Sequence, residues 1–478
     1  MRRRTFIAAG TGALAAFALP QLSPRALAAD LVDVTLTAAP LAFSPNPSTH
    51  FAGVAFNGSI PGPVLRVAHG QRFRATFHND GTAGSTVHWH GMILPNKMDG
   101  VENVTQRPVL RGESFVYEFT PGPPGTRWYH DHMSDGLLRG LFGMFVVEDP
   151  RDEKFDAEFA LVFHDVPRMS TVEQAMRGVS SAGMVDPLDS PEMRAMQPGD
   201  RMGDEVAYSA HCINGSSYPA TTPLAVKVGQ RVRLRILNAN PTQTRYVRLG
   251  GHRLTVTHSD GNPLAKPVEV DALRIGVAER YDAWFEVTTP GAWLLQGLSS
   301  DPLAFEQAVV VHTEGMEKAP PVGSPQSLEG VDFFTYAKAG GIAPSLTLLP
   351  ANHTYAFTLG GGAYGSSRWT INDQTYPDTP RIVVRHGDVV TVHFKNTTDM
   401  DHPMHLHGHV YHVVEVDGKA LARPLAKDTA LVRSNGGTMT WQFTADSPPG
   451  RWLLHCHNAV HMMDGMMTEV DYAKTPLT

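Results

Sequence analysis

Hydrophobic and polar positions alternate over short stretches of this chain. Residues 389–394, Val-Val-Thr-Val-His-Phe, are an example, and such alternation predicts a β-strand that buries one face. The chain has 44 Gly and 36 Pro residues, which suit turns between strands, and only 18% of its residues are charged. The pattern therefore favours an all-β protein of many short strands over a helical bundle or a disordered chain.

One motif occurs three times along the 478 residues. Each copy has a Pro, then a Gly, an alternating stretch, and an Asn nine residues after the Gly. The glycines are Gly70, Gly229 and Gly387, which are 159 and 158 residues apart, and the asparagines are Asn79, Asn238 and Asn396. A repeat this long predicts three similar domains rather than the short units of a solenoid.

A second landmark, a Gly followed closely by Trp, also occurs in each copy. Trp128, Trp293 and Trp452 lie 58, 64 and 65 residues after the repeated Gly, and we expect all three in domain cores. The two landmarks predict three consecutive Greek-key β-sandwich or barrel domains at about 30–150, 151–315 and 345–478. A Pro- and Gly-rich connector at 316–344 is expected between the last two.

The N-terminus predicts export. Arg2-Arg3-Arg4-Thr5-Phe6-Ile7 precedes a mildly apolar stretch and a small-residue site at Ala26-Leu27-Ala28. Residues 1–28 are similar to a twin-arginine signal peptide, with an ordinary secretory signal as the alternative. We expect the twin-arginine export machinery to deliver a mature chain, starting near Ala29, to the periplasm or the medium.

The net charge, the apolar runs and the cysteines limit the kinds of partner that this chain can have. The net charge of −7 argues against a nucleic-acid partner, and no apolar run is long enough to span a bilayer. We expect a monomer. The only cysteines are Cys212 and Cys456. We expect no disulfide between them, because Cys456 lies among histidines that suit it to metal binding, whereas Cys212 fits a small buried position.

Four His-x-His pairs are the strongest chemical signal. Alternate residues of a strand point to one face, so each pair would present two imidazoles together. The pairs are His88 and His90, His130 and His132, His405 and His407, and His455 and His457. Two pairs belong to the first predicted domain and two to the third. Eight imidazoles are too many for one ion and predict a cluster of two or three.

Cys456 lies between two of these histidines and would point to the opposite face of the strand. With His402, His461 and Met466 it makes the ligand set of a blue-copper electron-transfer site. Zinc also accepts Cys and His, but zinc does not require a thiolate between the ligands of another centre. The middle copy has Gln296-Gly297-Leu298 at the corresponding strand and no ligands.

These motifs, at residues 88–91, 128–132, 402–408 and 455–466, resemble the four copper motifs of the three-domain multicopper oxidases, which include laccases and bacterial cuprous oxidases. The resemblance implies three cupredoxin-like domains and four copper ions. It assigns the type 1 copper to His402, Cys456 and His461 with Met466 axial, the type 2 copper to His88 and His405, and the type 3 pair to His90, His130, His132, His407, His455 and His457.

The implied activity is a laccase-like oxidation of a phenolic or aromatic donor, one electron at a time, coupled to reduction of O2 to water. Asp99 resembles the family's acidic residue near the cluster and is a candidate proton donor; alternatively, Asp99-Gly100 is only a turn. Several bacterial members carry a carboxylate directly after the last ligand histidine. This chain has Met462 there, so a second acid at that position is absent.

Methionines raise a second candidate, a cuprous or metal oxidase, because thioethers suit Cu(I). Several lie at 165–205, which we expect to be a long loop over the middle domain that modulates donor access. The alternative is that these methionines fill apolar gaps. A non-enzymatic copper carrier or structural relative is disfavoured because all twelve ligand positions are filled.

Overall fold

Most of the described chain is β-structure. The structure is a computed structural model that describes residues 31–81, 84–133, 135–176, 206–298, 307–324, 329–340, 349–362 and 368–473. The predicted signal segment, 1–28, lies outside these ranges. Helices in the described ranges are short: η1 (Asn96–Met98), α1 (Gly136–Arg139), α2 (Met169–Met176), α4 (Tyr336–Gly340) and α5 (Ala459–Met463).

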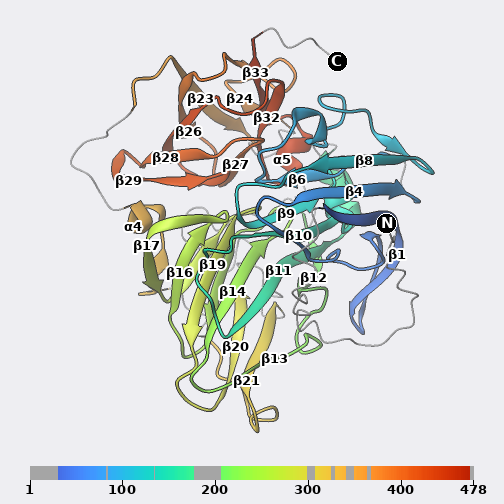
Figure 1. Cartoon of the computed structure of the whole chain (residues 1–478), viewed down its shortest axis with the longest axis vertical. Coiled ribbons are helices and arrows are strands. Elements are labelled where there is room, and N and C mark those ends of the chain that lie inside the picture. Colours follow the sequence, from blue (N-terminus) through green and yellow to red (C-terminus); the bar gives the residue numbers. More distant parts are fainter. Residues whose placement is uncertain are drawn as a thin grey trace.

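The strands fall into three successive groups along the chain (Figure 1). The first group is β1 (Leu31–Asn46), β2 (Thr49–Phe56), β3 (Leu65–Ala68), β4 (Arg72–Asn79), β5 (Gly84–Ser85), β6 (His88–His90), β7 (Val109–Leu110), β8 (Ser114–Phe119), β9 (Gly125–His130) and β10 (Phe142–Glu148). The second is β11 (Ala157–Pro167), β12 (Tyr208–Ile213), β13 (Leu224–Val226), β14 (Arg231–Asn238), β15 (Arg245–Leu249), β16 (Leu254–Ser259), β17 (Asn262–Val270), β18 (Ala272–Ile275), β19 (Arg280–Glu286), β20 (Ala292–Leu298), β21 (Ala308–Thr313) and β22 (Phe333–Phe334). The third is β23 (His353–Gly361), β24 (Trp369–Ile371), β25 (Ile382–Val384), β26 (Val389–Asn396), β27 (His402–Leu406), β28 (Tyr411–Val416), β29 (Lys419–Lys427), β30 (Thr429–Val432), β31 (Thr438–Thr444), β32 (Arg451–Cys456) and β33 (Met467–Tyr472).

Each group forms two main sheets with the same topology. In the first sheet of each group, two strands pair in parallel: β1 with β4, β11 with β14, and β23 with β26. The second sheet has the parallel pairs β3–β10, β13–β21 and β25–β33. The remaining main pairings are largely antiparallel. This repeated arrangement confirms the predicted all-β fold of three Greek-key sandwiches, while the residue boundaries of the domains stay predictions.

The repeated Gly and Asn have structural reasons. Gly70, Gly229 and Gly387 have φ values of 89°, 87° and 91°, which favour glycine at these turns. The asparagines end β4, β14 and β26 and are completely buried. Their side-chain amides donate to backbone carbonyls of other segments, for example Asn79 to Val109 and Asn396 to Val432. The motif therefore turns the chain and then ties the end of the next strand to its neighbours.

Two predicted irregular segments contain regular structure. The expected loop at 165–205 begins as the end of β11 and continues as α2, so the prediction is wrong over 165–176; residues 177–205 lie outside the described ranges. Within the connector at 316–344, β22 pairs with β18 and Val322 bridges to Trp293. This connector is thus partly built into the middle sandwich.

The core explains both the Trp landmark and the cysteines. Trp128, Trp293 and Trp452 are buried, as predicted. Cys212 and Cys456 are both buried and free of disulfides.

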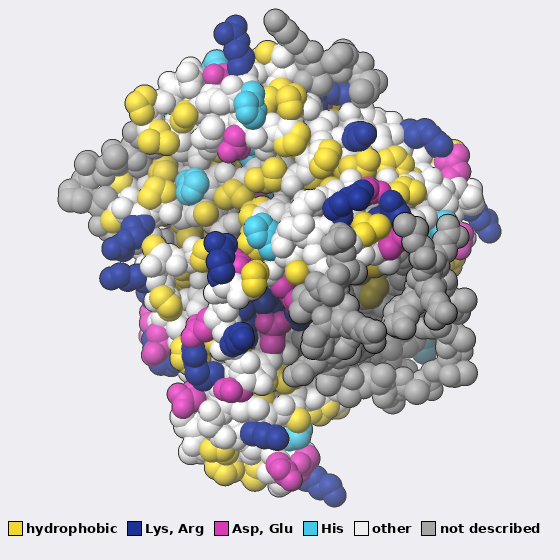
Figure 2. Space-filling model, in the orientation of Figure 1, with side chains coloured by type: hydrophobic (Ala, Val, Ile, Leu, Met, Phe, Trp, Pro, Cys, Tyr) yellow, Lys and Arg dark blue, Asp and Glu magenta, His cyan; other side chains and the backbone are white. Residues whose placement is uncertain are grey.

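No helix in the described ranges is long and apolar enough to cross a membrane. On the face drawn in Figure 2, Lys and Arg are interspersed with Asp and Glu over the described surface, without a continuous basic patch.

Candidate metal centre

Eight histidines from the two outer sandwiches meet in one buried space. The first sandwich contributes β6 and the end of β9, which pair side by side; the third contributes the ends of β27 and β32, which also pair. These strands lie in the upper half of Figure 1, where the first and third sandwiches meet. All eight side chains are buried: His88, His90, His130, His132, His405, His407, His455 and His457.

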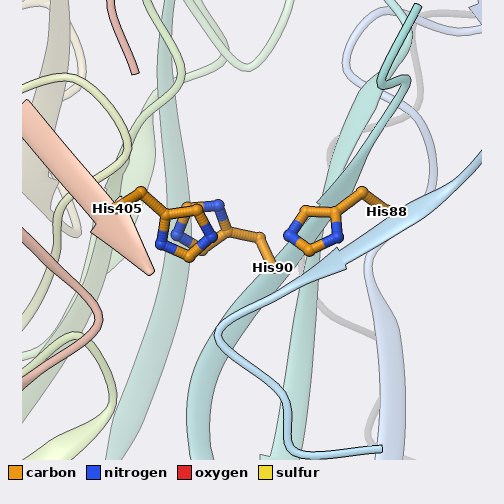
Figure 3. A group of neighbouring side chains, drawn as sticks. All are labelled: His88, His90 and His405. Atoms are coloured by element: carbon orange, nitrogen blue, oxygen red, sulfur yellow. The ribbon is translucent and has the colours of Figure 1, made fainter. Parts of the chain in front are cut away.

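The ring nitrogens form three groups whose candidate ligand atoms lie within 4.8 Å of one another. One group is His90, His130 and His457, and the second is His132, His407 and His455. The third is His88, His90 and His405. Figure 3 shows the third group, in which the His90 and His405 rings stack at a centroid distance of 3.7 Å and His88 lies opposite them.

Hydrogen bonds fix which nitrogen is available to a metal in seven of the eight rings, His457 being the exception. In six of the rings Nδ1 donates to an oxygen, so the lone pair is on Nε2. The acceptors are the carbonyls of Asp99 for His88, Asp131 for His130, Asp428 for His405 and Cys456 for His455, and the carboxylates of Glu102 for His132 and Asp99 for His407. In agreement, the Nε2 atoms are buried without a hydrogen-bond partner in His88, His130, His132 and His405. Such convergent, unprotonated nitrogens are what a metal ion requires.

His90 is turned the other way. Its Nε2 donates to Asp428 Oδ1, at 3.1 Å, with Thr429 Oγ1 at 3.0 Å. Its Nδ1 is buried without a hydrogen-bond partner. Asp428 and Thr429 therefore make Nδ1 the available atom of this one ring.

Electrostatics keep most of these rings neutral. Burial, joined by repulsion between neighbouring rings, holds the pKa values of His90, His130, His405, His407 and His455 well below their ordinary value. Burial also lowers the pKa of His457 to about 3. His132 differs, because its contact with Glu102 outweighs burial and raises its pKa.

A second, smaller site contains the thiol. Cys456 Sγ lies 3.6 Å from His402 Nδ1 and 3.4 Å from His461 Nδ1, and the two nitrogens are 3.0 Å apart. His461 is positioned by α5, whose first turn is capped by the Asn458 side chain. Met466 is completely buried, and its backbone carbonyl accepts the N–H of Cys456 at 3.0 Å. Three donors suited to a soft transition metal thus converge beside a buried methionine.

The alternation predicted for residues 455–457 brings the two sites together. His455 and His457 belong to two different histidine groups of the cluster, whereas Cys456 belongs to the thiol site. Cys456 is therefore adjacent in sequence to one member of each of these two histidine groups. Among the described residues of the middle sandwich no such group is found, and Gln296, on the corresponding strand, accepts the backbone N–H of Ser324.

Asp99 is both a turn residue and a partner of the cluster. It follows η1, and Gly100 after it has φ +78°. A Cβ on Gly100 would lie 1.9 Å from the Val87 carbonyl oxygen, so this turn packs tightly beneath β6. The turn places Asp99 in contact with His407 through Oδ2 at 2.9 Å, while its buried Oδ1 lies 3.3 Å from His88 Nδ1.

Several contacts of the site are not visible in the sequence. Glu102 on His132, Asp428 on His90, and Trp369, whose ring lies 3.7 Å from that of His461, come from segments without a motif. A pocket also reaches His130, His132 and His457, with Met462 in its wall. Met462, directly after His461, therefore lies close to the cluster, where its side chain is a thioether rather than a carboxylate.

Fold and site together define a metalloprotein with a histidine cluster between its outer domains and a thiolate site beside it. Sequence profiles described as multicopper oxidase match residues 38–152, 187–313 and 349–475. The chain is 35% identical over 432 residues to the multicopper oxidase MmcO of Mycobacterium tuberculosis, covering 88% of this chain and 83% of that protein. It is 25% identical to a copper resistance protein A homolog of Pseudomonas syringae pv. tomato, covering 95% and 94%.

Solved structures agree. A multicopper oxidase from Pseudomonas thermotolerans superposes with a TM-score of 0.68 and 27% identity, over 93% of this chain and 99% of that one. A laccase from Botrytis aclada has a TM-score of 0.77 at 21% identity, over 94% and 89%, which confirms the cupredoxin-like fold. The chain belongs to the multicopper oxidase family of oxidoreductases, whose cofactor is copper.

Proposed function

We propose that this protein couples four one-electron oxidations of a phenolic or other aromatic donor to the four-electron reduction of O2 to water. His402, Cys456 and His461 would hold the type 1 copper, with Met466 axial. His88 and His405 would hold the type 2 copper, and the two groups His90–His130–His457 and His132–His407–His455 would each hold one type 3 copper.

The observation that carries the proposal is the position of Cys456 between His455 and His457. Electrons taken up at the thiol site need only cross the peptide chain of residues 455–457 to reach either histidine group. Copper supplies the reversible one-electron exchange and the binding of O2. The buried imidazoles would supply its ligands, and the Asp99 carboxylate, which accepts from His407 Nδ1 at 2.9 Å, would deliver protons there.

The direct test is to load the purified protein with Cu(II) and to measure copper per chain, the blue absorption, the paramagnetic copper signals and O2 uptake. The proposal expects four copper ions, of which one is blue and one is a non-blue paramagnetic centre. A chain that binds copper only at the thiol site, or releases peroxide as its main product, would contradict it.

A metal oxidase of Cu(I) is the second candidate. One similar protein is a copper resistance protein A homolog, and methionines lie near the thiol site. Met169 of α2 and Met463 of α5 are partly buried in one cluster with Val460, next to His461. Thioethers in this position suit the soft Cu(I) ion, although they also fill apolar gaps.

O2 uptake with Cu(I) and with a phenol, measured side by side with and without added Cu(II), separates the two donors. A dominant phenol rate without added copper supports the laccase assignment, whereas strong turnover of Cu(I) alone supports the metal oxidase.

The segment after α2 is expected to influence this preference. The helix that precedes this segment, α2, packs against α5, the helix that carries His461, through Met169 and Val172. Deletion of residues 175–200 should change the ratio of the Cu(I) rate to the phenol rate. If the deletion changes neither the Cu(I) rate nor the phenol rate, the segment has no role in donor access.

We also propose export by the twin-arginine route. Replacing Arg2, Arg3 and Arg4 by Lys should retain the precursor inside the cell, which fractionation of the producing cells would detect. A mature protein exported as before would favour an ordinary secretory signal.

A further inference from the structure

A buried network of charges lies behind the histidine cluster, where all three sandwiches meet. It contains three cations and three carboxylates, and each of these side chains is at most 1% exposed. The cations are Arg127, Arg280 and Lys427, and the carboxylates are those of Asp260, Glu279 and Asp428. Charges buried this deeply are retained only when they are paired.

Arg280, at the start of β19 in the middle sandwich, is the main partner of Asp428. Its Nη2 contacts Asp428 Oδ2 at 2.5 Å, and its Nη1 contacts Oδ1 at 2.7 Å. Arg127 is farther away, at 3.4 Å. A two-point contact of this kind fixes the direction of a carboxylate as well as its charge.

The middle sandwich also holds the backbone around Asp428. Asp260, in the turn between β16 and β17, accepts the N–H groups of Asp428 at 3.3 Å and Thr429 at 3.1 Å. A Cβ on Gly125 would lie 2.0 Å from the Gly261 carbonyl oxygen of the same turn. This turn is therefore packed against both outer sandwiches, and it leaves residue 428 little freedom.

Asp428 passes this restraint to the cluster. Its Oδ1, the atom held by Arg280 Nη1, is the acceptor for His90 Nε2. His90 is the ring whose Nδ1 is available, and its ring stacks on His405 with a 13° angle between the planes. Without a fixed acceptor, the ring could turn and present Nε2 like its neighbours.

We propose that Arg280 is a positioning residue of the copper cluster, through which the ligand-free middle domain sets the orientation of His90. Arg280 holds both oxygens of Asp428, Asp428 holds Nε2–H of His90, and Nδ1 then faces the metal. The inference rests on the proposed assignment of His90 to a type 3 copper.

The test compares Arg280→Met and Arg280→Lys with the wild-type holoenzyme. Loss of a partner that orients a metal ligand typically costs about 10- to 100-fold in metal affinity or activity. We expect Arg280→Met to lose the near-ultraviolet absorption of the type 3 pair and to reduce O2 at least about tenfold more slowly. The blue absorption per chain should persist, because the thiol site makes no contact with Arg280. Arg280→Lys keeps the charge but not the two-point contact, so an intermediate loss is expected.

Arg245→Met is the matched control. Arg245 is an equally buried arginine of the middle sandwich, paired with Asp165 at 2.5 Å, and it contacts none of the proposed ligands in the described structure. This variant should lower the melting temperature without changing the ratio of type 3 to blue absorption.

The outcomes distinguish the ligand assignment from the positioning role of Arg280. If the wild-type chain itself shows no type 3 absorption, the ligand assignment fails. If the wild type shows it and a folded Arg280→Lys or Arg280→Met variant keeps it at full strength, only the positioning role fails. Equal loss in Arg245→Met would also overturn that role, since the effect would then be a general loosening of the domain.

Discussion

Replacement of Cys456 by Ser is expected to abolish both the blue absorption and the oxidase activity while the fold persists. The thiolate is the soft ligand of the proposed type 1 site and the source of its blue colour. It is also the residue that joins this site to both histidine groups, so electrons from the donor would have no direct entry to the cluster. Visible absorption, copper per chain and O2 uptake measure the loss.

The fold should survive this change because Ser is similar in size to Cys and its hydroxyl faces the same two imidazoles, at His402 and His461. Circular dichroism and the melting temperature check this. Cys212→Ser is the matched control, since Cys212 is also buried and forms no disulfide but belongs to the middle sandwich. A blue, active Cys456→Ser variant, or a colourless Cys212→Ser variant, would contradict the assignment.

Asp99→Asn should slow O2 reduction by about 10- to 100-fold while the blue absorption survives. The amide keeps the size of the side chain and an oxygen for the 2.9 Å contact with His407 Nδ1. It removes the negative charge and the capacity to carry a proton. Because the Asp99 backbone carbonyl still accepts from His88, the turn should remain in place.

Two half-reactions localise the effect. Anaerobic bleaching of the blue absorption by the donor should keep its wild-type rate, since the thiol site is untouched. Return of the blue colour on addition of O2 should be slowed. Unchanged turnover would leave Asp99-Gly100 as a turn only, and slow bleaching would show that the variant disturbs the thiol site instead.

The repeat and the histidine pairs could be predicted because they depend on local periodicity. Strand alternation predicted that His455 and His457 face the cluster and that Cys456 faces the other site. In the structure His455 and His457 each belong to a histidine group, and Cys456 belongs to the thiol site. The alternation even holds where the strands end, since His132, His407 and His457 lie just beyond β9, β27 and β32.

A third repeated element, an Asn in a turn of each domain, was not predicted from the sequence. Asn57, Asn214 and Asn372 have φ values of 54°, 51° and 51°, and each side-chain oxygen accepts a backbone N–H from the long strand at the start of its domain. The donors are Thr37, Val162 and Thr358. The signal was present as Asn-Gly, Asn-Gly and Asn-Asp, but such dipeptides are common in turns and gain meaning only from their partners.

The partners of the ligands could not be predicted for a different reason. His90 and Asp428 are 338 residues apart, and Arg280 and Asp428 are 148 apart. Contacts between domains depend on how whole sandwiches pack against one another. The periodicity of a short stretch of sequence does not predict this packing. The helix at 169–176 was not predicted because eight residues are too few for the helical spacing of Met169, Val172 and Met176 to stand out.

The two metal sites differ in how much of the chain must be in place before they exist. The thiol site draws its groups from residues 402–466, all within the third sandwich. The cluster needs residues 88–132 and 405–457 together, from opposite ends of the sequence. In the proposed assignment, a chain in which only the third sandwich had folded would therefore hold the type 1 copper without the cluster. Such a molecule would be coloured and reducible but unable to pass its electrons to O2.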